Sequence, residues 1–222
     1  MAHSNVVPNE MTVNLQEQFD KVFVQLEKLG VLLISDSCFP NVYQLIAGDG
    51  RKGSWWGDKQ AHTIFAVNER LEDHPDVMLM KLISGKVTFV HRELWDRVYA
   101  IGIAREEWQL RKLSTGAKLL LKTVDAEGTL QANKLGNTFG PKPSETTREL
   151  ELRILVHAAQ VHTEAGAHAK ILKNWNEWAN DIGFRVRPMS PAAARRFLEQ
   201  RVAQINNDHP GANGSLPWTA KL

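Results

Sequence analysis

Apolar residues recur at helical spacing in several parts of this chain. The clearest stretch runs from Asn14 to Gly30, where the spacing predicts an amphipathic helix that ends at the glycine. The same spacing predicts helices over 58–73, 93–103 and 188–206. The apolar positions of the first helix are Leu15, Phe19, Val22, Phe23, Leu26 and Leu29.

Two extended runs flank a tight turn in the first half of the chain. Residues 76–83 and 86–90 are rich in apolar and β-branched residues, and Ser84 and Gly85 lie between them. This pattern predicts a β-hairpin over 76–90. A short buried strand is predicted just after the first helix, at Val31–Ile34.

The second half has a different order of elements. The segment 114–128 begins with serine and ends with glycine, which predicts a capped helix. Residues 129–135 form either a short helix or an extended lead-in. A third helix is predicted over 144–161, and a turn at 163–168 leads into an extended run at 169–172. Three helices followed by a hairpin are typical of a winged helix-turn-helix module.

These elements predict an α+β fold that is mainly helical, with short β-hairpins and winged-helix-like modules. We expect an N-terminal α+β module over 1–110, containing the 76–90 hairpin. A winged-helix-like module with the C-terminal helix is expected over 111–206. Residues 207–222 carry proline, glycine and asparagine and are predicted to form a loosely ordered tail.

Composition narrows the class of protein. The 222 residues are 43% hydrophobic and 23% charged, an ordinary globular balance with no apolar run long enough to span a membrane. The N-terminal residues do not resemble a secretory signal, and Cys38 is the single cysteine. We therefore expect a cytoplasmic protein without a disulfide or a cysteine-rich zinc site. The sequence makes no prediction about oligomeric state.

Basic residues are unevenly distributed, although the formal net charge is only +2. Between Lys81 and Lys122 there are nine lysines and arginines against four acids, and five arginines over 185–201 face only Glu199. Such stretches form either a phosphate-binding stripe or a solvated helix face, and the sequence leaves both interpretations open.

Three of the eight histidines lie within a single run, at His157, His162 and His168. A helical zinc site needs histidines one turn apart, whereas His157 and His162 are five residues apart and diverge by about 140° around a helix. We therefore interpret His157 as a packed residue. His162, Glu164 and His168 could come together only if the turn folds back on itself.

No motif indicates a reaction. The chain has no nucleophile elbow and no phosphate-binding loop that ends in Gly-Lys-Ser/Thr. No metal or cofactor is predicted. The enzymatic alternative is a small hydrolase or glycosylase-like protein that uses His162, Glu164 and His168 in a cleft.

Binding is the better supported function class. The start of the third predicted helix carries hydroxyl and basic groups that could hold phosphates. The hairpin predicted after this helix carries two lysines, Lys170 and Lys173. Trp55 lies in a Gly/Ser turn, where burial is difficult. The predicted nucleic-acid-binding residues are Lys142, Thr146, Thr147, Arg148, Lys170, Lys173 and Trp55. Against this, the third helix is unusually acidic for one that contacts DNA.

Several segments together resemble short bacterial proteins related to the AlkZ/YcaQ DNA glycosylases of the winged-helix superfamily. They are Gly53–Gly57 (GSWWG), Met80–Val90 with Leu94 and Trp95, Leu113–Gly128, and Arg148–Leu152 onward to Trp178, within residues 30–185. The resemblance implies tandem winged-helix-like modules and association with DNA. The glycosylases use glutamine, an apolar residue, then glutamine or aspartate, whereas Gln16–Gln18 has a charged residue in the middle. We expect no glycosylase activity.

We therefore favour a non-enzymatic DNA-binding or regulatory protein whose partner is duplex DNA. The rival interpretations are the small enzyme described above and a protein-interaction scaffold that uses exposed tryptophans.

Overall fold

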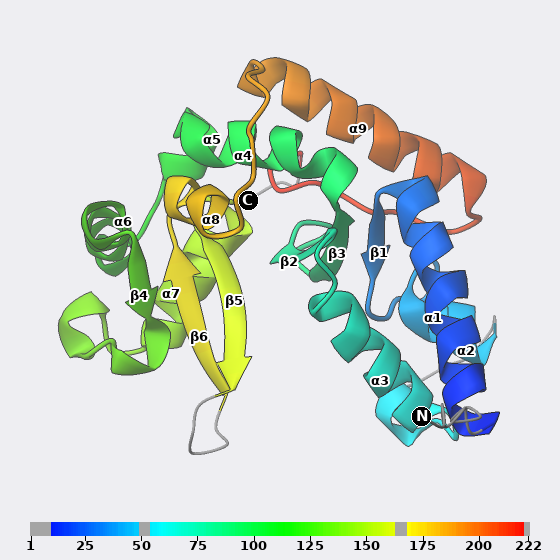
Figure 1. Ribbon diagram of the computed structural model, residues 1–222. Coiled ribbons are helices and arrows are strands. Elements are labelled where there is room, and N and C mark those ends of the chain that lie inside the picture. Colours follow the sequence, from blue (N-terminus) through cyan, green and yellow to red (C-terminus); the bar gives the residue numbers. More distant parts are fainter. Residues whose placement is uncertain (1–9, 49–53, 163–167, 220–222) are drawn as a thin grey trace, which may run out of the picture.

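The computed structural model of the chain describes residues 10–48, 54–162 and 168–219. These residues form an arch in which two small α+β units hang from a helical bridge (Figure 1). Each unit contains one three-stranded antiparallel sheet. The predicted fold class, mainly helical α+β with short hairpins, is confirmed.

The first unit runs helix, strand, two helices, then hairpin. Its sheet has the strand order β1-β3-β2, and the predicted hairpin is confirmed. Gly30 ends the first helix with a positive φ of 78°, which a glycine adopts without strain. The elements are α1 (Glu10–Leu29), β1 (Val31–Leu33), α2 (Val42–Ala47), α3 (Ala61–Glu72), β2 (Val77–Lys81) and β3 (Val87–His91), with a short 3-10 helix at Trp55–Gly57.

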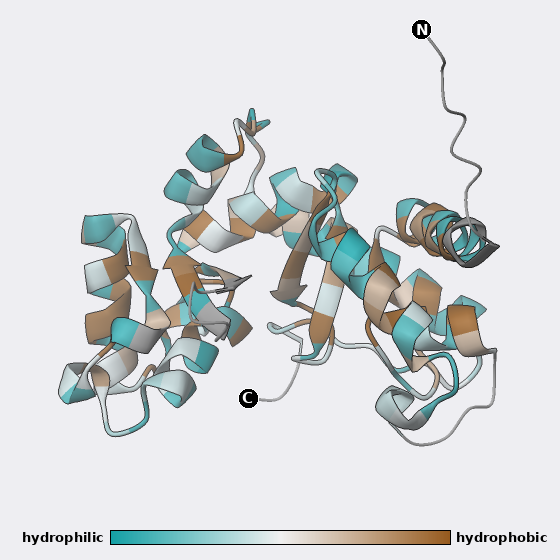
Figure 2. Cartoon of the chain, turned by 60° about the horizontal axis from the view of Figure 1, so that its bottom comes forward, coloured by the Kyte–Doolittle hydropathy of each residue, from teal (hydrophilic) through white to brown (hydrophobic). Residues whose placement is uncertain are grey.

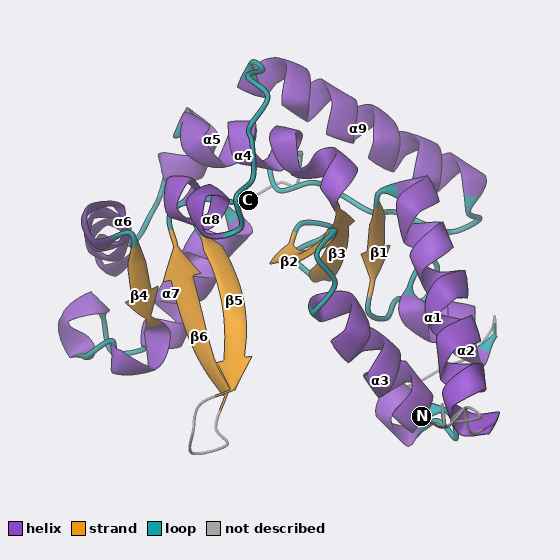
Figure 3. Cartoon of the chain, viewed as in Figure 1, coloured by secondary structure: helices purple, strands orange, loops and turns teal. Residues whose placement is uncertain are grey.

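The second unit repeats this order. Its sheet has the order β4-β6-β5, so in both units the third strand lies between the first and the second (Figure 3). Two 3-10 turns take the place of the second helix. The elements are α6 (Thr115–Glu127), β4 (Thr129–Gln131), the 3-10 turns Ala132–Lys134 and Asn137–Phe139, α7 (Pro143–Leu152), β5 (His157–His162) and β6 (His168–Lys173).

The bridge consists of α4 (Trp95–Ala104), α5 (Glu107–Leu110), α8 (Trp175–Asp181) and α9 (Pro191–Asp208), with a 3-10 turn at Arg92–Leu94. The last helix packs along α4 and shares its core with the first unit. It was expected to accompany the second unit. Its buried side chains, Ala194, Leu198, Val202 and Ile205, instead continue the core under the first sheet.

The C-terminal segment is not loosely ordered as predicted, at least as far as residue 219. Leu216 is 2% exposed within the core of the first unit. The Ser84 N–H donates to the Ser215 carbonyl over 2.7 Å, and Trp218 Nε1 donates to Glu199. The side chains of Leu216 and Trp218 and the backbone pairing of Ser84 with Ser215 therefore hold this segment in place. Its composition alone indicates a loop.

The first sheet is buried on both faces. Leu32 and Phe89 point toward α1, α2 and α3, whereas Val31 and Val90 point toward α4 and α9. This alternation follows from the two-residue period of a strand. A third core, built by α6, α7 and the second sheet around Leu120, stabilises the second unit.

The third helix of the second unit is shorter than predicted. It ends at Leu152 rather than near Val161, and Ile154 adopts a left-handed φ of 55°. The residues that follow form β5, in which His157 pairs with Lys173. Pairing with β6 overrides the helix propensity of Ala158, Ala159 and Gln160.

Across the described parts of the chain, the helices are too short or too polar to cross a membrane. In Figure 2 they carry mixed hydrophilic and hydrophobic surfaces rather than uniformly apolar ones.

Candidate nucleic-acid interface

His157 starts β5 and packs against two tryptophans of α8. Its ring centroid lies 6.0 Å from that of Trp175 and 5.7 Å from that of Trp178, and its Nδ1 is buried without a hydrogen-bond partner. The predicted packing is found, although on a strand rather than a helix. Burial, together with the nearby positive charge of Lys173, lowers the pKa of His157 to about 4 from its ordinary value of 6.5.

This pKa predicts acid sensitivity. Below pH 6.5 the unfolded chain protonates His157, while the folded chain resists protonation until about pH 4. The free energy of unfolding should therefore fall by about 2–3 kcal/mol as the pH drops through this window. Urea unfolding from pH 7 to pH 4 should show this loss in the wild type and a flatter profile in His157→Phe. His209→Gln, which changes a partly exposed histidine at the end of α9, should behave as the wild type. Parallel profiles for wild type and His157→Phe would contradict the assignment.

The other members of the histidine run lie at the end of the second hairpin. His162 and His168 are register partners on β5 and β6. Glu164 lies outside the described residues. Within the described ranges, no three histidine, cysteine, aspartate or glutamate side chains lie close enough to hold a metal ion. Nothing in the described geometry therefore favours the hydrolase alternative.

The predicted hydroxyl groups of the third helix do not face solvent. Thr146 and Thr147 are 8% and 2% exposed. Their hydroxyls donate to the carbonyls of Phe139 and Pro143, both over 2.9 Å. They stabilise the start of α7 and cannot contact a phosphate, which corrects the prediction at these two positions.

Three of the predicted cations are already paired with carboxylates. Lys142 lies 2.9 Å from Glu145 on an exposed surface. Lys170 pairs with the buried Glu151, and Lys173 pairs with Asp181. Arg148 is different, because it is exposed and has no ion-pair partner among the described residues.

The acidity of α7 has a structural explanation. Glu149 accepts hydrogen bonds from both the backbone N–H and the hydroxyl of Ser114, at 3.0 and 2.7 Å. Glu151, 7% exposed, holds Lys81 and Lys170, and Glu145 pairs with Lys142. Two of the three carboxylates of α7 are therefore paired with lysines, and the negative charge of Glu149 alone has no cationic partner in the described structure.

The hydrogen bonds between Ser114 and Glu149 also bring two further cations beside α7. Arg111 and Lys112 precede the N-cap of α6, and both are exposed without an ion-pair partner in the described structure. Because Ser114 is bonded to Glu149, Arg111 and Lys112 lie on the segment that approaches α7, and Arg148 precedes Glu149 on that helix. We call Arg111, Lys112 and Arg148 the basic corner. The sequence gives an indication of Arg111 and Lys112 as a basic site, since residues 111–122 contain four cations and no acid.

The first unit presents a less suitable surface. The turn of its hairpin is covered, because Ser84 bonds to Ser215 and Leu152 lies against Gly85. Its third helix exposes Glu69 and Glu72.

The exposed indole of the first unit is Trp56 rather than Trp55. Trp55 is partly buried against the core, whereas Trp56 is 65% exposed. The two rings stack with centroids 3.8 Å apart. Trp55 therefore serves mainly as the inner support of Trp56.

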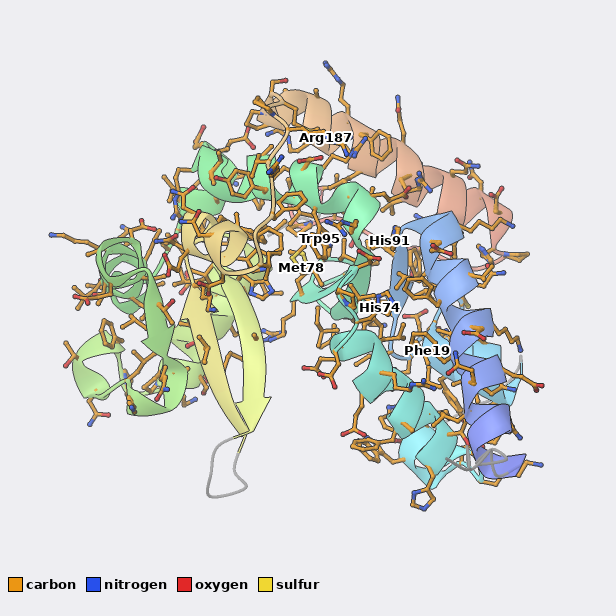
Figure 4. The ribbon with its side chains drawn as sticks, viewed as in Figure 1. Phe19, His74, Met78, His91, Trp95 and Arg187 are labelled. Atoms are coloured by element: carbon orange, nitrogen blue, oxygen red, sulfur yellow. The ribbon has the colours of Figure 1, made fainter. Side chains whose placement is uncertain are left out.

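A cluster of rings lies along the first unit between α1 and the sheet, where Figure 4 shows Phe19, His74 and His91 following one another. Phe23 joins them, with its centroid 4.3 Å from that of His74 and 6.0 Å from that of His91. Arg70 stacks over Phe19 and donates to Gln16 on α1. These contacts are within the protein, and Gln16 is exposed on α1.

Comparison with family models, with curated proteins and with solved structures finds no significant match to this chain. The relation to AlkZ/YcaQ proteins therefore stays a prediction.

Proposed function

We propose that this chain is a non-enzymatic DNA-binding protein whose two units are winged-helix modules and whose second unit contacts the duplex. The observation that carries the proposal is the basic corner. Its three exposed cations have no ion-pair partner among the described residues, and they lie on two segments that the bonds between Ser114 and Glu149 hold together. We place the protein in the cytoplasm on the basis of its single unpaired cysteine.

The repeated architecture supports this assignment. In helix-turn-helix proteins, a helix presented by its neighbours enters the major groove while flanking groups hold the phosphates. Here α7 packs on α6, and strands β5 and β6 lie on the side of the second unit that faces the first unit (Figure 1). Arg148 on α7, together with Arg111 and Lys112, would contact the backbone.

The test is the salt dependence of binding to a duplex of about 20 base pairs, long enough to exceed the footprint of one module. Affinity should fall as salt rises, because each phosphate contact releases counterions. Replacing Arg111, Lys112 and Arg148 together with alanine should weaken binding and reduce the slope of log K against log salt by about 3. Fluorescence anisotropy with a labelled duplex measures both quantities.

A matched control removes the same charge elsewhere. Lys28, Lys59 and Arg185 are exposed and have no ion-pair partner in the described structure, so the Lys28→Ala, Lys59→Ala, Arg185→Ala variant has the same net charge as the test variant. It should retain most of the affinity and the slope. Equal losses in both variants would show a nonspecific effect of net charge, and no binding at low salt would refute the proposal.

A further inference from the structure

An open cleft of about 380 Å³ lies between α5 and the adjoining face of α6. Leu113 and Leu121, 5% and 7% exposed, line it from the core side, and Leu110, 38% exposed, stands at its edge. The lining is completed by Lys118, Lys122 and Asp125. The cleft therefore combines an apolar floor with charged groups on one side.

The charge of this cleft is positive. Lys118 and Lys122 are exposed, lie one helical turn apart and have no ion-pair partner among the described residues. The carboxylate of Asp125 is occupied, because its Oδ1 lies 2.5 Å from Arg105. Two unpaired ammonium groups thus border three leucines.

We propose that this cleft binds an acidic amphipathic helix of a partner protein. A helix of this kind places apolar side chains along one stripe, which can enter the leucine floor, and carboxylates beside them, which can meet the two lysines. A DNA duplex satisfies only the lysines, because its backbone offers no apolar group. A small molecule would remain largely in water in so open a cleft, whereas small-molecule sites enclose most of their ligand.

The inference is independent of DNA binding. The lining residues are different from Arg111, Lys112 and Arg148, so either proposal can fail without the other. The ion pairs with the two lysines should make the affinity for the partner helix fall as salt rises. The apolar contacts with the leucines should make the affinity depend on those side chains as well.

The experiment uses the full chain and a fluorescein-labelled peptide of about 14 residues, long enough for a few helical turns. The peptide carries leucines at helical i, i+3, i+4 and i+7 positions and glutamates at most others. Saturable binding with a Kd on the order of tens of micromolar is expected for so small a surface. A peptide with lysine in place of every glutamate should not bind.

Two variants, which change three exposed side chains, separate the contribution of charge from that of apolar burial. Lys118→Glu with Lys122→Glu should weaken binding at least about tenfold, since attraction becomes repulsion. Leu110→Gln should weaken it about fivefold at unchanged charge, from loss of apolar burial. Thermal unfolding of the variants should match the wild type, because all three side chains are exposed.

Other outcomes would overturn the proposal. Unchanged peptide affinity in Leu110→Gln would show that the leucine floor is unused. Binding to phosphatidylserine vesicles without peptide binding would assign the cleft to a membrane surface. Loss of affinity for the DNA duplex in the lysine variant, without peptide binding by the wild type, would assign it to nucleic acid.

Discussion

Gly102→Ala should destabilise the protein by about 3 kcal/mol or more, which is the opposite of the usual effect of this substitution in a helix. Alanine normally stabilises a helix by up to about 1 kcal/mol relative to glycine. Here a Cβ at position 102, in the last turn of α4, would overlap the indole of Trp175. That indole is 2% exposed, donates from Nε1 to the Ile154 carbonyl over 2.8 Å and packs edge-on against Trp178. It has no free space to move into, so overpacking should dominate.

Urea unfolding followed by far-ultraviolet circular dichroism measures this loss. Gly57→Ala is the matched control, because a Cβ there meets nothing within 4 Å, and its effect should stay within about 0.5 kcal/mol. Trp175→Phe, combined with Gly102→Ala, should cost less than the sum of the two single changes, since the smaller ring makes room for the new methyl group. A Gly102→Ala protein as stable as the wild type would show that α4 and α8 are not in contact as described.

The elements that the sequence predicted correctly are those with local signals. Ser114 and Gly128 cap α6 through contacts within a few residues, and the Ser114 hydroxyl oxygen accepts from the Ala117 N–H. The Ser84–Gly85 turn joins two strands that are adjacent in sequence, so the β2–β3 hairpin follows from local chemistry. Such features require no knowledge of the rest of the fold.

The elements that were mispredicted depend on distant partners. Residues 157–162 are strand because β6 pairs with them, and the tail is ordered because Leu216 enters a core formed largely by earlier residues. The close approach of Gly102 to Trp175 joins positions more than seventy residues apart, and spacing along the chain gives no sign of it.

The candidate site shows the same division. The acid-free run at residues 111–122 is visible in the sequence, but its approach to α7, which carries Arg148, depends on the bonds between Ser114 and Glu149. Thr146 and Thr147 have suitable chemistry, but both side chains are buried. Hydroxyl groups near the start of a helix can bond to carbonyls of the protein itself, and the sequence does not tell whether they do so or face solvent. Sequence reasoning could identify cationic side chains, and it could not tell which of them are already neutralised.

Glu151→Gln should cost about 3 kcal/mol, because it removes the carboxylate that joins the two units. Glu151 on α7 lies 2.6 Å from Lys81 on β2 of the first unit and also pairs with Lys170 on β6 of the second. Its side chain is 7% exposed, whereas the two lysines are 21% and 29% exposed. With glutamine in this position, two ammonium groups face each other without a counter-charge and must be hydrated at the expense of the contact between β2 and α7.

Urea unfolding measures the loss, and a variant without any of the three charges tests its cause. Replacing Glu151 with leucine and both Lys81 and Lys170 with methionine should recover stability to within about 1 kcal/mol of the wild type, since a well-packed apolar set can replace a buried ion pair. Glu145→Gln, which breaks only the exposed pair with Lys142, should leave the unfolding midpoint unchanged. If Glu151→Gln unfolds at the same urea concentration as the wild type, the ion triad does not hold the units together. If the apolar triple variant is as unstable as Glu151→Gln, the cost comes from packing around position 151 rather than from the two unpaired lysines.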